Sequence, residues 1–170
     1  MHLLKLILAL IILCTLSSCT KKDKTVESNL SGTWRLDKTE SLDNNTGKWY
    51  YDSAFYGWTG YIIYDGHGYM GVEITPKGYK DFNANKNLDS LSCDGIKELV
   101  KFYKTNWVYF AEYKITGSTI EHKRISATEP KDWGTTLIRD FEIKSDTLIL
   151  FPRETMGGKK SRLWWVKMLQ

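Results

Sequence analysis

The sequence has few cysteines and histidines, and this shortage excludes several kinds of site. Its 170 residues include three cysteines, Cys14, Cys19 and Cys93, and three histidines. Because Cys14 and Cys19 lie in an N-terminal segment that we expect to be processed, Cys93 has no partner for an intrachain disulfide. Beyond that segment the histidines are His67 and His122, too few with one cysteine for a typical four-ligand zinc site. The sequence therefore predicts neither a disulfide nor a metal site.

Motifs of common enzyme and cofactor sites are also missing. The chain has no GxSxG, HExxH, CxxC, Walker or EF-hand pattern. Its 24 basic and 20 acidic residues are scattered along the chain, and the net charge of +4 is small. Binding to nucleic acid is therefore not expected. No cofactor and no protein partner are implied.

The N-terminus has the pattern of an exported protein. Lys5 precedes an apolar run from Leu6 to Leu16 that is broken only by Thr15. This run is shorter than the stretch of about 20 residues that crosses a bilayer. A cleaved signal peptide is therefore predicted over residues 1–18.

The four residues at 16–19, LSSC, resemble the bacterial lipobox, in which a cysteine after small residues is acylated and becomes the new N-terminus. The resemblance implies acyl chains such as palmitate on Cys19 and membrane attachment in the cell envelope. Thr20 stands where aspartate is associated with inner-membrane retention, which favours the outer membrane. The polar residues 19–29 are then a flexible tether. The alternative is an ordinary secreted protein with Cys19 as a free thiol.

Aromatic residues are abundant, and apolar residues often alternate with polar ones. Seven Trp, ten Tyr and six Phe make up 14% of the chain, a composition that favours β-strands. A first strand begins at Gly32 and ends before a turn at residues 43–47. Further strands are predicted at residues 61–64, 69–74, 107–115, 119–125, 135–144, 147–151 and 160–169.

One segment has the spacing of a helix instead. Ile96, Leu99 and Tyr103 recur at helical intervals after a candidate N-cap at Asp94, which predicts a helix over residues 94–104. About eight strands joined by short turns, with one short helix, predict an all-β protein. We expect a closed up-and-down antiparallel barrel in a single domain over residues 30–170.

Residues 66–71, GHGYMG, match the GxGxxG fingerprint of dinucleotide-binding proteins. That fingerprint requires the glycines to open a helix. Here they precede the strand-forming residues Tyr69, Val72 and Ile74. We therefore predict a hairpin turn at residues 65–68 and no dinucleotide site.

Two polar residues are predicted on the inner face of the barrel. Arg139 alternates in phase with Leu137 and Phe141, and His122 alternates in phase with Ile120. A buried guanidinium needs a partner, so Arg139 either pairs with an internal acid in a structural role or meets an anionic ligand. His122 is either structural or a second donor beside Arg139 for a carboxylate or oxyanion.

A structural role is predicted for two residues of the first and last strands. Trp34 lies near the start of the domain, and Arg162 alternates in phase with Trp164 near its end. A guanidinium stacked on the Trp34 indole would close one end of the barrel and join the two strands.

An ordered set of motifs resembles the bacterial lipocalin-like domain family over roughly residues 30–168. The motifs are GTWRL at 32–36, GYIIYDGHGYMGV at 60–72, YKITG at 113–117, IEH at 120–122, WGT at 133–135, RDF at 139–141 and DTL at 146–148. The resemblance implies a closed barrel with an internal cavity. Carried over by position, the family pattern points to Trp34, Tyr64, His122, Trp133 and Arg139, with Trp133 in a structural role. Family members commonly have two adjacent histidines where this chain has His122 followed by lysine.

Three functional hypotheses follow. In the first, the barrel binds a small hydrophobic or amphipathic molecule in the envelope, and Arg139 and His122 hold its polar end. The aromatic residues expected to line that cavity are Trp58, Tyr64, Trp107, Tyr109 and Tyr113. In the second, the same barrel is an isomerase or cyclase in which His122 exchanges protons and Arg139 stabilises an anion. In the third, the barrel is filled by its own side chains and the protein has a structural or interaction role.

Overall fold

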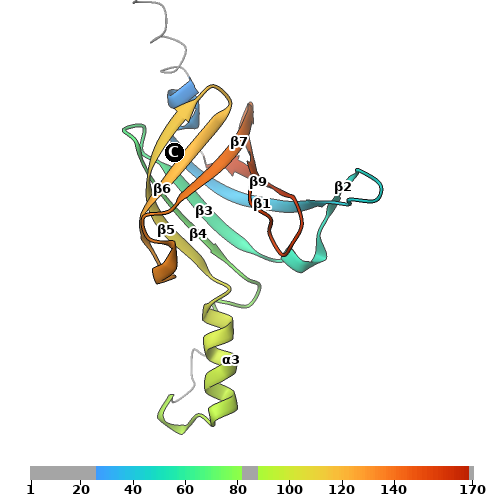
Figure 1. The fold of residues 1–170 in the computed structure, drawn as a ribbon, viewed down its shortest axis with the longest axis vertical. Coiled ribbons are helices and arrows are strands. Elements are labelled where there is room, and N and C mark those ends of the chain that lie inside the picture. The colour runs from blue at the N-terminus through green and yellow to red at the C-terminus, as the bar shows by residue number, and fades with distance from the viewer. Residues whose placement is uncertain (1–25, 82–87, 169–170) are drawn as a thin grey trace, which may run out of the picture.

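A computed structural model describes residues 26–81 and 88–168 of the chain. Within them, eight strands form a closed antiparallel barrel, and one further strand extends it (Figure 1). The barrel strands are β1 (Gly32–Leu42), β3 (Thr59–Tyr64), β4 (Tyr69–Thr75), β5 (Trp107–Thr116), β6 (Thr119–Ala127), β7 (Thr136–Lys144), β8 (Thr147–Pro152) and β9 (Ser161–Lys167). Each pairs with the next, and β9 pairs with β1. The predicted fold class is confirmed.

Closure depends on the length of β1. Its first part pairs with β3, from Gly32 opposite Tyr64, and its last part pairs with the extra strand β2 (Trp49–Tyr51). The other edge of β1 pairs with β9, with one register shift between Leu36 and Lys38. Both edges of β1 are therefore hydrogen-bonded, and the barrel has no open edge at this seam.

One end of the barrel is closed by large apolar side chains. Trp34 is fully buried, and its Nε1 donates to the carbonyl oxygen of Leu30 at 2.8 Å. Residues 26–30 form a helical turn, in which Leu30 is buried and Val26 packs against the core. Residues 26–29 are thus part of a helical turn packed on the barrel and do not belong to the flexible tether that the sequence predicted. The sequence did not indicate the core contacts of Val26 and Leu30, because the residues around them are polar.

The predicted contact between Arg162 and Trp34 is wrong. Trp34 lies opposite Lys167 in the ladder between β1 and β9, and the Lys167 Nζ sits 5.0 Å from the centre of the Trp34 ring system. Arg162 lies opposite Glu40, at the other end of β1, and its Nε donates to Glu40 Oε2 at 2.6 Å. The register of the closing pair decides this, and periodicity within a single strand does not reveal it.

On the outer face of the β1–β9 pair, Arg162 stacks on two other tryptophans instead of Trp34. Its guanidinium lies over the rings of Trp49 and Trp164, at 4.6 and 5.1 Å from their centres. Trp164 also donates from Nε1 to Glu40 Oε2 at 2.8 Å. Arg162 thus packs against the outside of the barrel and joins β9 to β1 and β2.

The predicted hairpin at residues 65–68 is confirmed. It joins β3 to β4, and Asp65 Oδ1 accepts hydrogen bonds from the backbone N–H groups of His67 at 2.7 Å and Tyr69 at 2.9 Å. Gly66 and Gly68 have φ angles of 77° and 100°, a conformation that favours glycine. These glycines of the GxGxxG match shape a turn.

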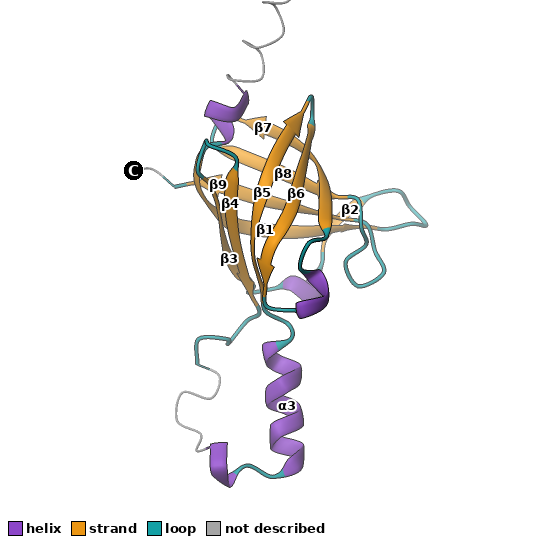
Figure 2. Cartoon of the chain, turned by 60° about the vertical axis from the view of Figure 1, so that its left-hand side comes forward, coloured by secondary structure: helices purple, strands orange, loops and turns teal. Residues whose placement is uncertain are grey.

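The predicted helix is present as α3 (Cys93–Tyr103), and it extends away from the barrel (Figure 2). Its N-cap is Ser92, whose Oγ accepts from Gly95 N at 3.2 Å, so the predicted cap at Asp94 is wrong by two residues. Tyr79 holds the base of the helix by stacking on Phe102 at 5.5 Å. The helix therefore does not plug the barrel.

The described residues also form three short 3-10 helices: η1 (Ser53–Phe55), η2 (Leu88–Ser90) and η3 (Pro130–Asp132). Within residues 26–81 and 88–168, no helix combines the length and apolarity needed to cross a membrane. The predicted signal peptide and Cys19 lie outside the described residues.

Candidate functional site

The end of the barrel opposite Trp34 contains a cavity of about 620 Å³. Strands β5, β6 and β7 form its walls, and the segments after β6 and β8 border its opening. We call it the mouth cavity. Its lining residues are Lys104, Asn106, Trp107, Val108, Tyr109, Arg124, Ala127, Thr128, Glu129, Lys131, Asp132, Leu137, Arg139, Glu154, Thr155 and Met156.

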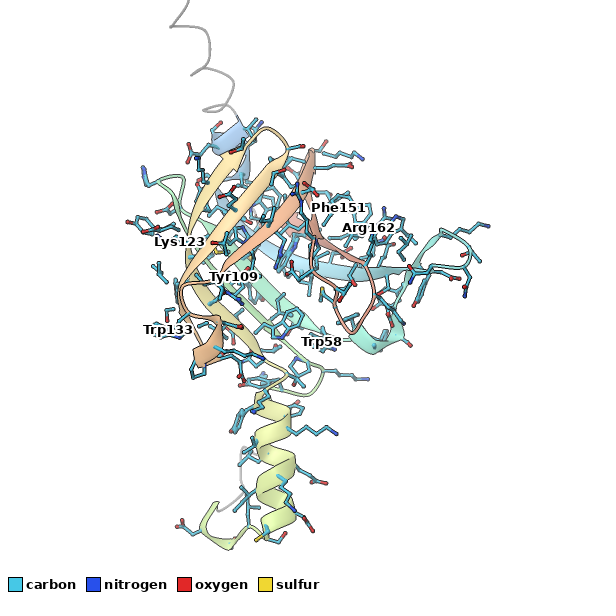
Figure 3. All side chains as sticks on the ribbon, in the orientation of Figure 1. Trp58, Tyr109, Lys123, Trp133, Phe151 and Arg162 are labelled. Atoms are coloured by element: carbon cyan, nitrogen blue, oxygen red, sulfur yellow. The ribbon has the colours of Figure 1, made fainter. Side chains whose placement is uncertain are left out.

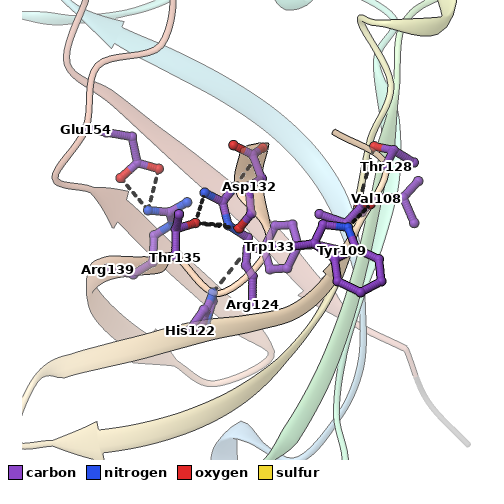
Figure 4. A network of polar contacts seen from close by, with 11 residues as sticks. Val108, Tyr109, His122, Arg124, Thr128, Asp132, Trp133, Thr135, Arg139 and Glu154 are labelled. Carbon is purple, nitrogen blue, oxygen red and sulfur yellow. Dashed lines mark hydrogen bonds and ion pairs between the residues drawn. The ribbon is translucent and has the colours of Figure 1, made fainter. Parts of the chain in front are cut away.

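Arg139 provides the buried charge of the mouth cavity. It lies on β7 in phase with the inward-facing Phe141, and it is 9% exposed. Its Nη1 pairs with Glu154 at 2.5 Å and donates to the carbonyl oxygen of Ile138 at 3.3 Å (Figure 4). The inward orientation predicted from the alternation is confirmed, and the partner is a carboxylate from the segment that joins β8 to β9.

A second guanidinium, that of Arg124, braces the segment between β6 and β7. Its Nη1 lies 3.0 Å from Asp132 Oδ2, and its Nε donates to Thr135 Oγ1 at 2.8 Å. The Arg124 guanidinium also lies 5.9 Å from the centre of the Tyr109 ring. Arg124 therefore ties β6 to the segment that precedes β7.

His122 lies behind the mouth cavity and is fully buried. Its Nε2 is 3.0 Å from the Tyr64 hydroxyl, and its Nδ1 is 3.1 Å from the Tyr109 hydroxyl. Burial and, to a smaller extent, the positive charge of Arg139 together lower the pKa of His122 to about 3. The imidazole is therefore neutral at physiological pH and bridges two tyrosines.

The hydroxyls of Tyr64 and Tyr109 differ in the hydrogen-bond partners open to them, and this difference favours one tautomer of His122. A neutral imidazole carries one N–H, so it donates to one hydroxyl and accepts from the other. Burial raises the pKa of Tyr64 well above its usual value, so its hydroxyl keeps its proton. Among the described residues, the hydrogen-bond partner of this hydroxyl is His122. Because an unpaired buried donor is costly, Tyr64 donates to Nε2. The proton of His122 then sits on Nδ1, and Tyr109 keeps its own proton for the cavity.

The acid–base role predicted for His122 in the isomerase hypothesis has no geometric support. A proton-transfer group must come within hydrogen-bond reach of the substrate, yet His122 does not line the mouth cavity and meets it only through Tyr109. Its lowered pKa also means that the acidic imidazolium form is not populated at neutral pH, so His122 cannot act there as a general acid. Among the described residues, no group of three His, Cys, Asp or Glu side chains is placed to hold a metal ion.

The predicted aromatic residues are spread along the barrel. Trp107 and Tyr109 line the mouth cavity, whereas Trp58 packs behind Trp107, with ring centres 6.2 Å apart. Tyr64 and Tyr113 are in edge contact at 5.1 Å, and the Tyr113 hydroxyl donates to Glu27 Oε1 at 3.3 Å, on the side of the closed end. Of the predicted residues, the structure thus brings Arg139, Trp107 and Tyr109 together at the cavity.

Trp133 lies outside the barrel beside η3, and Figure 3 shows it apart from Tyr109. It is 56% exposed, and its Nε1 donates to the carbonyl oxygen of Ala127 at 2.7 Å. This contact pins the segment that follows β6, next to Asp132 of the Arg124 pair. Trp133 has no place in the cavity wall.

Sequence reasoning missed two residues that shape the site, Glu154 and Met156. Both lie in residues 153–160, which join β8 to β9 and which we call the β8–β9 segment. Met156 is buried and lines both the mouth cavity and a smaller inner cavity of about 40 Å³. The segment contains Gly157 and Gly158 and has no periodicity, so the sequence carried no signal that its side chains turn inward.

The rest of the interior is largely filled. Trp34, Trp165, Tyr64 and Leu148 are almost fully buried inside the barrel. The space inside is therefore concentrated at the mouth, and the inner cavity of about 40 Å³ is roughly the size of one or two water molecules. The hypothesis of a filled barrel is right for the closed end and wrong for the mouth.

A closed antiparallel barrel of eight strands with a cavity at one end defines the class of lipocalin-like barrels. The lipocalin-like domain family matches residues 31–168 of the chain, and the chain belongs to this family. The resemblance seen in the sequence is thus confirmed. A comparison with curated proteins finds no match.

Solved structures similar to this chain include crystal structures of two single-site asparagine variants of the fluorescent protein UnaG. Each is 13% identical in sequence, and the alignments cover 84% and 85% of this chain and 99% of each UnaG chain. The TM-score is 0.39 in both cases. A likeness at this level carries no argument about the ligand.

Proposed function

We propose that this protein binds a small amphipathic or hydrophobic molecule in the mouth cavity, with an acidic or other oxygen-rich group directed at Arg139. The observation that carries the proposal is a nearly buried guanidinium in the wall of a cavity of about 620 Å³. Cavities that hold small ligands typically measure about 300 to 1,000 Å³.

The chemistry of the wall supports an amphipathic ligand. Trp107, Val108 and Leu137 offer apolar surface, while Arg139 and the Tyr109 hydroxyl offer hydrogen-bond donors. A ligand that places its apolar part against the first group and its acceptor oxygens against the second satisfies both. A fully apolar ligand would cover the Tyr109 hydroxyl without offering it an acceptor, which costs free energy.

Binding is tested with the chain from Thr20 onward, which keeps every contact among the described residues. The probes are N-phenyl-1-naphthylamine, whose fluorescence rises in apolar sites, and dodecanoate as its competitor. We expect saturable binding of the first probe and its displacement by the second. A fluorescence rise that never saturates would contradict the proposal.

A matched pair of variants places the binding in the cavity. Leu137→Trp adds bulk to the cavity wall and should reduce probe affinity strongly. Ile138→Trp makes a similar change at the next position of β7, which does not line the cavity, and should leave affinity near that of the wild type. Equal affinities of both variants would place the probe elsewhere.

We further propose that the barrel is held on the envelope membrane, in the outer membrane, by acyl chains on Cys19. The support is the LSSC sequence at residues 16–19 after an apolar run of signal-peptide length. Two or more acyl chains are needed for durable attachment.

In cells fed an alkyne-labelled fatty acid, the wild-type protein should carry the label and sediment with the membranes. Cys19→Ser should lose both properties. Cys93→Ser, which removes the exposed free cysteine at the start of α3, should keep both. Fatty-acid label on the Cys19→Ser protein would contradict the anchoring proposal.

A further inference from the structure

The ion pair between Arg139 and Glu154 joins a nearly buried group to a partly exposed one. Arg139 lies on β7 between two hydrogen-bonded neighbours, β6 and β8, and its side chain is 10% exposed. Glu154 lies in the β8–β9 segment, and its side chain is 42% exposed. The cation is therefore built into the barrel wall, whereas the carboxylate can leave toward solvent.

Met156 occupies apolar space two residues further along the same segment. It is buried, and it lines both the mouth cavity and the inner cavity, as do Glu154 and Arg139. Residues 154–156 thus present a carboxylate and an apolar chain to the site, which is the combination that an amphipathic acid would bring. Withdrawal of this short stretch would join the two cavities.

The inner cavity also contains a donor without an acceptor. Trp165 is 1% exposed and lines this cavity, and its Nε1 has no hydrogen-bond partner among the described residues. Buried indole N–H groups usually have a partner. An acceptor oxygen that entered beside Arg139 would meet this second donor in the same cavity.

We infer that residues 154–156 are an internal mimic of the ligand, in which Glu154 holds the place of the acidic group and Met156 the place of the apolar part. This inference rests on the proposed function and specifies its ligand class as an amphipathic anion. Binding then exchanges one carboxylate at Arg139 for another acidic group. Since a tethered competitor acts at an effective concentration of up to about millimolar, its removal should strengthen anion binding on the order of tenfold.

The test compares two probes that share a chromophore and differ in charge. 8-Anilinonaphthalene-1-sulfonate carries a sulfonate, and N-phenyl-1-naphthylamine lacks it. Glu154→Gln should increase affinity for the sulfonate probe on the order of tenfold and change affinity for the neutral probe much less. Arg139→Gln should reduce affinity for the sulfonate probe selectively.

Glu142→Gln is the matched control. It makes the same change of charge at a carboxylate that is 48% exposed and pairs with Lys144 on the outer face of β7. Its affinity for both probes should equal that of the wild type. A gain as large as that of Glu154→Gln would show a general charge effect and overturn the inference.

Met156→Ala provides an independent arm, because it leaves the ion pair intact and empties the apolar position. It should strengthen binding of both probes, and an unchanged affinity would overturn the role of Met156. If Glu154→Gln and wild type bind the sulfonate probe equally, the mimic is refuted while the proposed function stands. If neither probe binds any of these folded proteins, the proposed function fails as well.

Discussion

The two ends of the barrel differ in the side chains that they carry. At the closed end, Trp34, Leu30 and Val26 fill the interior. At the mouth, the inward positions of β5, β6 and β7 carry Tyr109, Arg124 and Arg139 around a cavity of about 620 Å³. A barrel can therefore place stability at one end and a polar site at the other.

The largest predicted effect lies at the closed end. Trp34→Ala should lower the free energy of unfolding by about 3–5 kcal/mol, because it removes a fully buried ring and its hydrogen bond to Leu30. Urea denaturation measures the change. Trp133→Ala, the control, should cost about 1 kcal/mol or less, since that ring is 56% exposed. Equal losses would mean that the closed end does not dominate stability.

The next effect concerns the histidine behind the mouth. His122 has a pKa of about 3 in the folded protein, against 6.5 in the unfolded chain. As the pH falls, His122 is therefore protonated in the unfolded chain before it is protonated in the folded protein. The free energy of unfolding keeps its full value above about pH 6.5 and decreases as the pH drops toward 3. The slope should approach about 1.4 kcal/mol per pH unit.

Urea denaturation between about pH 7 and pH 5 measures this slope above the range in which carboxyl groups titrate. His122→Gln should flatten it. His67→Gln, at the exposed hairpin, should leave it as in the wild type. A flat profile in the wild-type protein would contradict the burial of a neutral His122.

A smaller effect is expected on the stability of α3, the helix beyond the mouth of the barrel. Ser92→Ala removes the N-cap of α3 and should destabilise that helix by about 1 kcal/mol. Because α3 has no buried residues, the loss should stay local. Hydrogen exchange should quicken in α3 and remain unchanged in β5 and β6, whereas a uniform change would show that helix and barrel unfold together.

The last prediction concerns the tautomer of His122 and sharpens the description of the mouth. Long-range ¹H–¹⁵N spectra should show the proton of His122 on Nδ1, the nitrogen that faces Tyr109. Tyr64→Phe removes the donor to Nε2 and should weaken this preference. A proton on Nε2 in the wild-type protein would reverse the roles of the two tyrosines.

Much of the fold was predictable because strands have a local signature. The alternation around Arg139 and His122 correctly placed both side chains inside, and the Asp-Gly pair at residues 65–66 correctly marked a hairpin. The contact of Arg162 with Glu40, in place of the predicted contact with Trp34, was not predictable, because it depends on the register between β9 and β1. Glu154 and Met156 escaped notice because the segment that carries them has no periodic pattern.

By itself, the sequence determined the class of fold and the inward or outward facing of most strand residues, since side chains alternate along a strand with a period of two. It also determined that Arg139 needs a partner, because a buried charge without one is costly. Only the tertiary structure decided that this partner is Glu154 and that His122 meets the cavity through Tyr109. The first contact depends on the conformation of the β8–β9 segment and the second on the register of the paired strands β5 and β6, and no local sequence pattern reveals either.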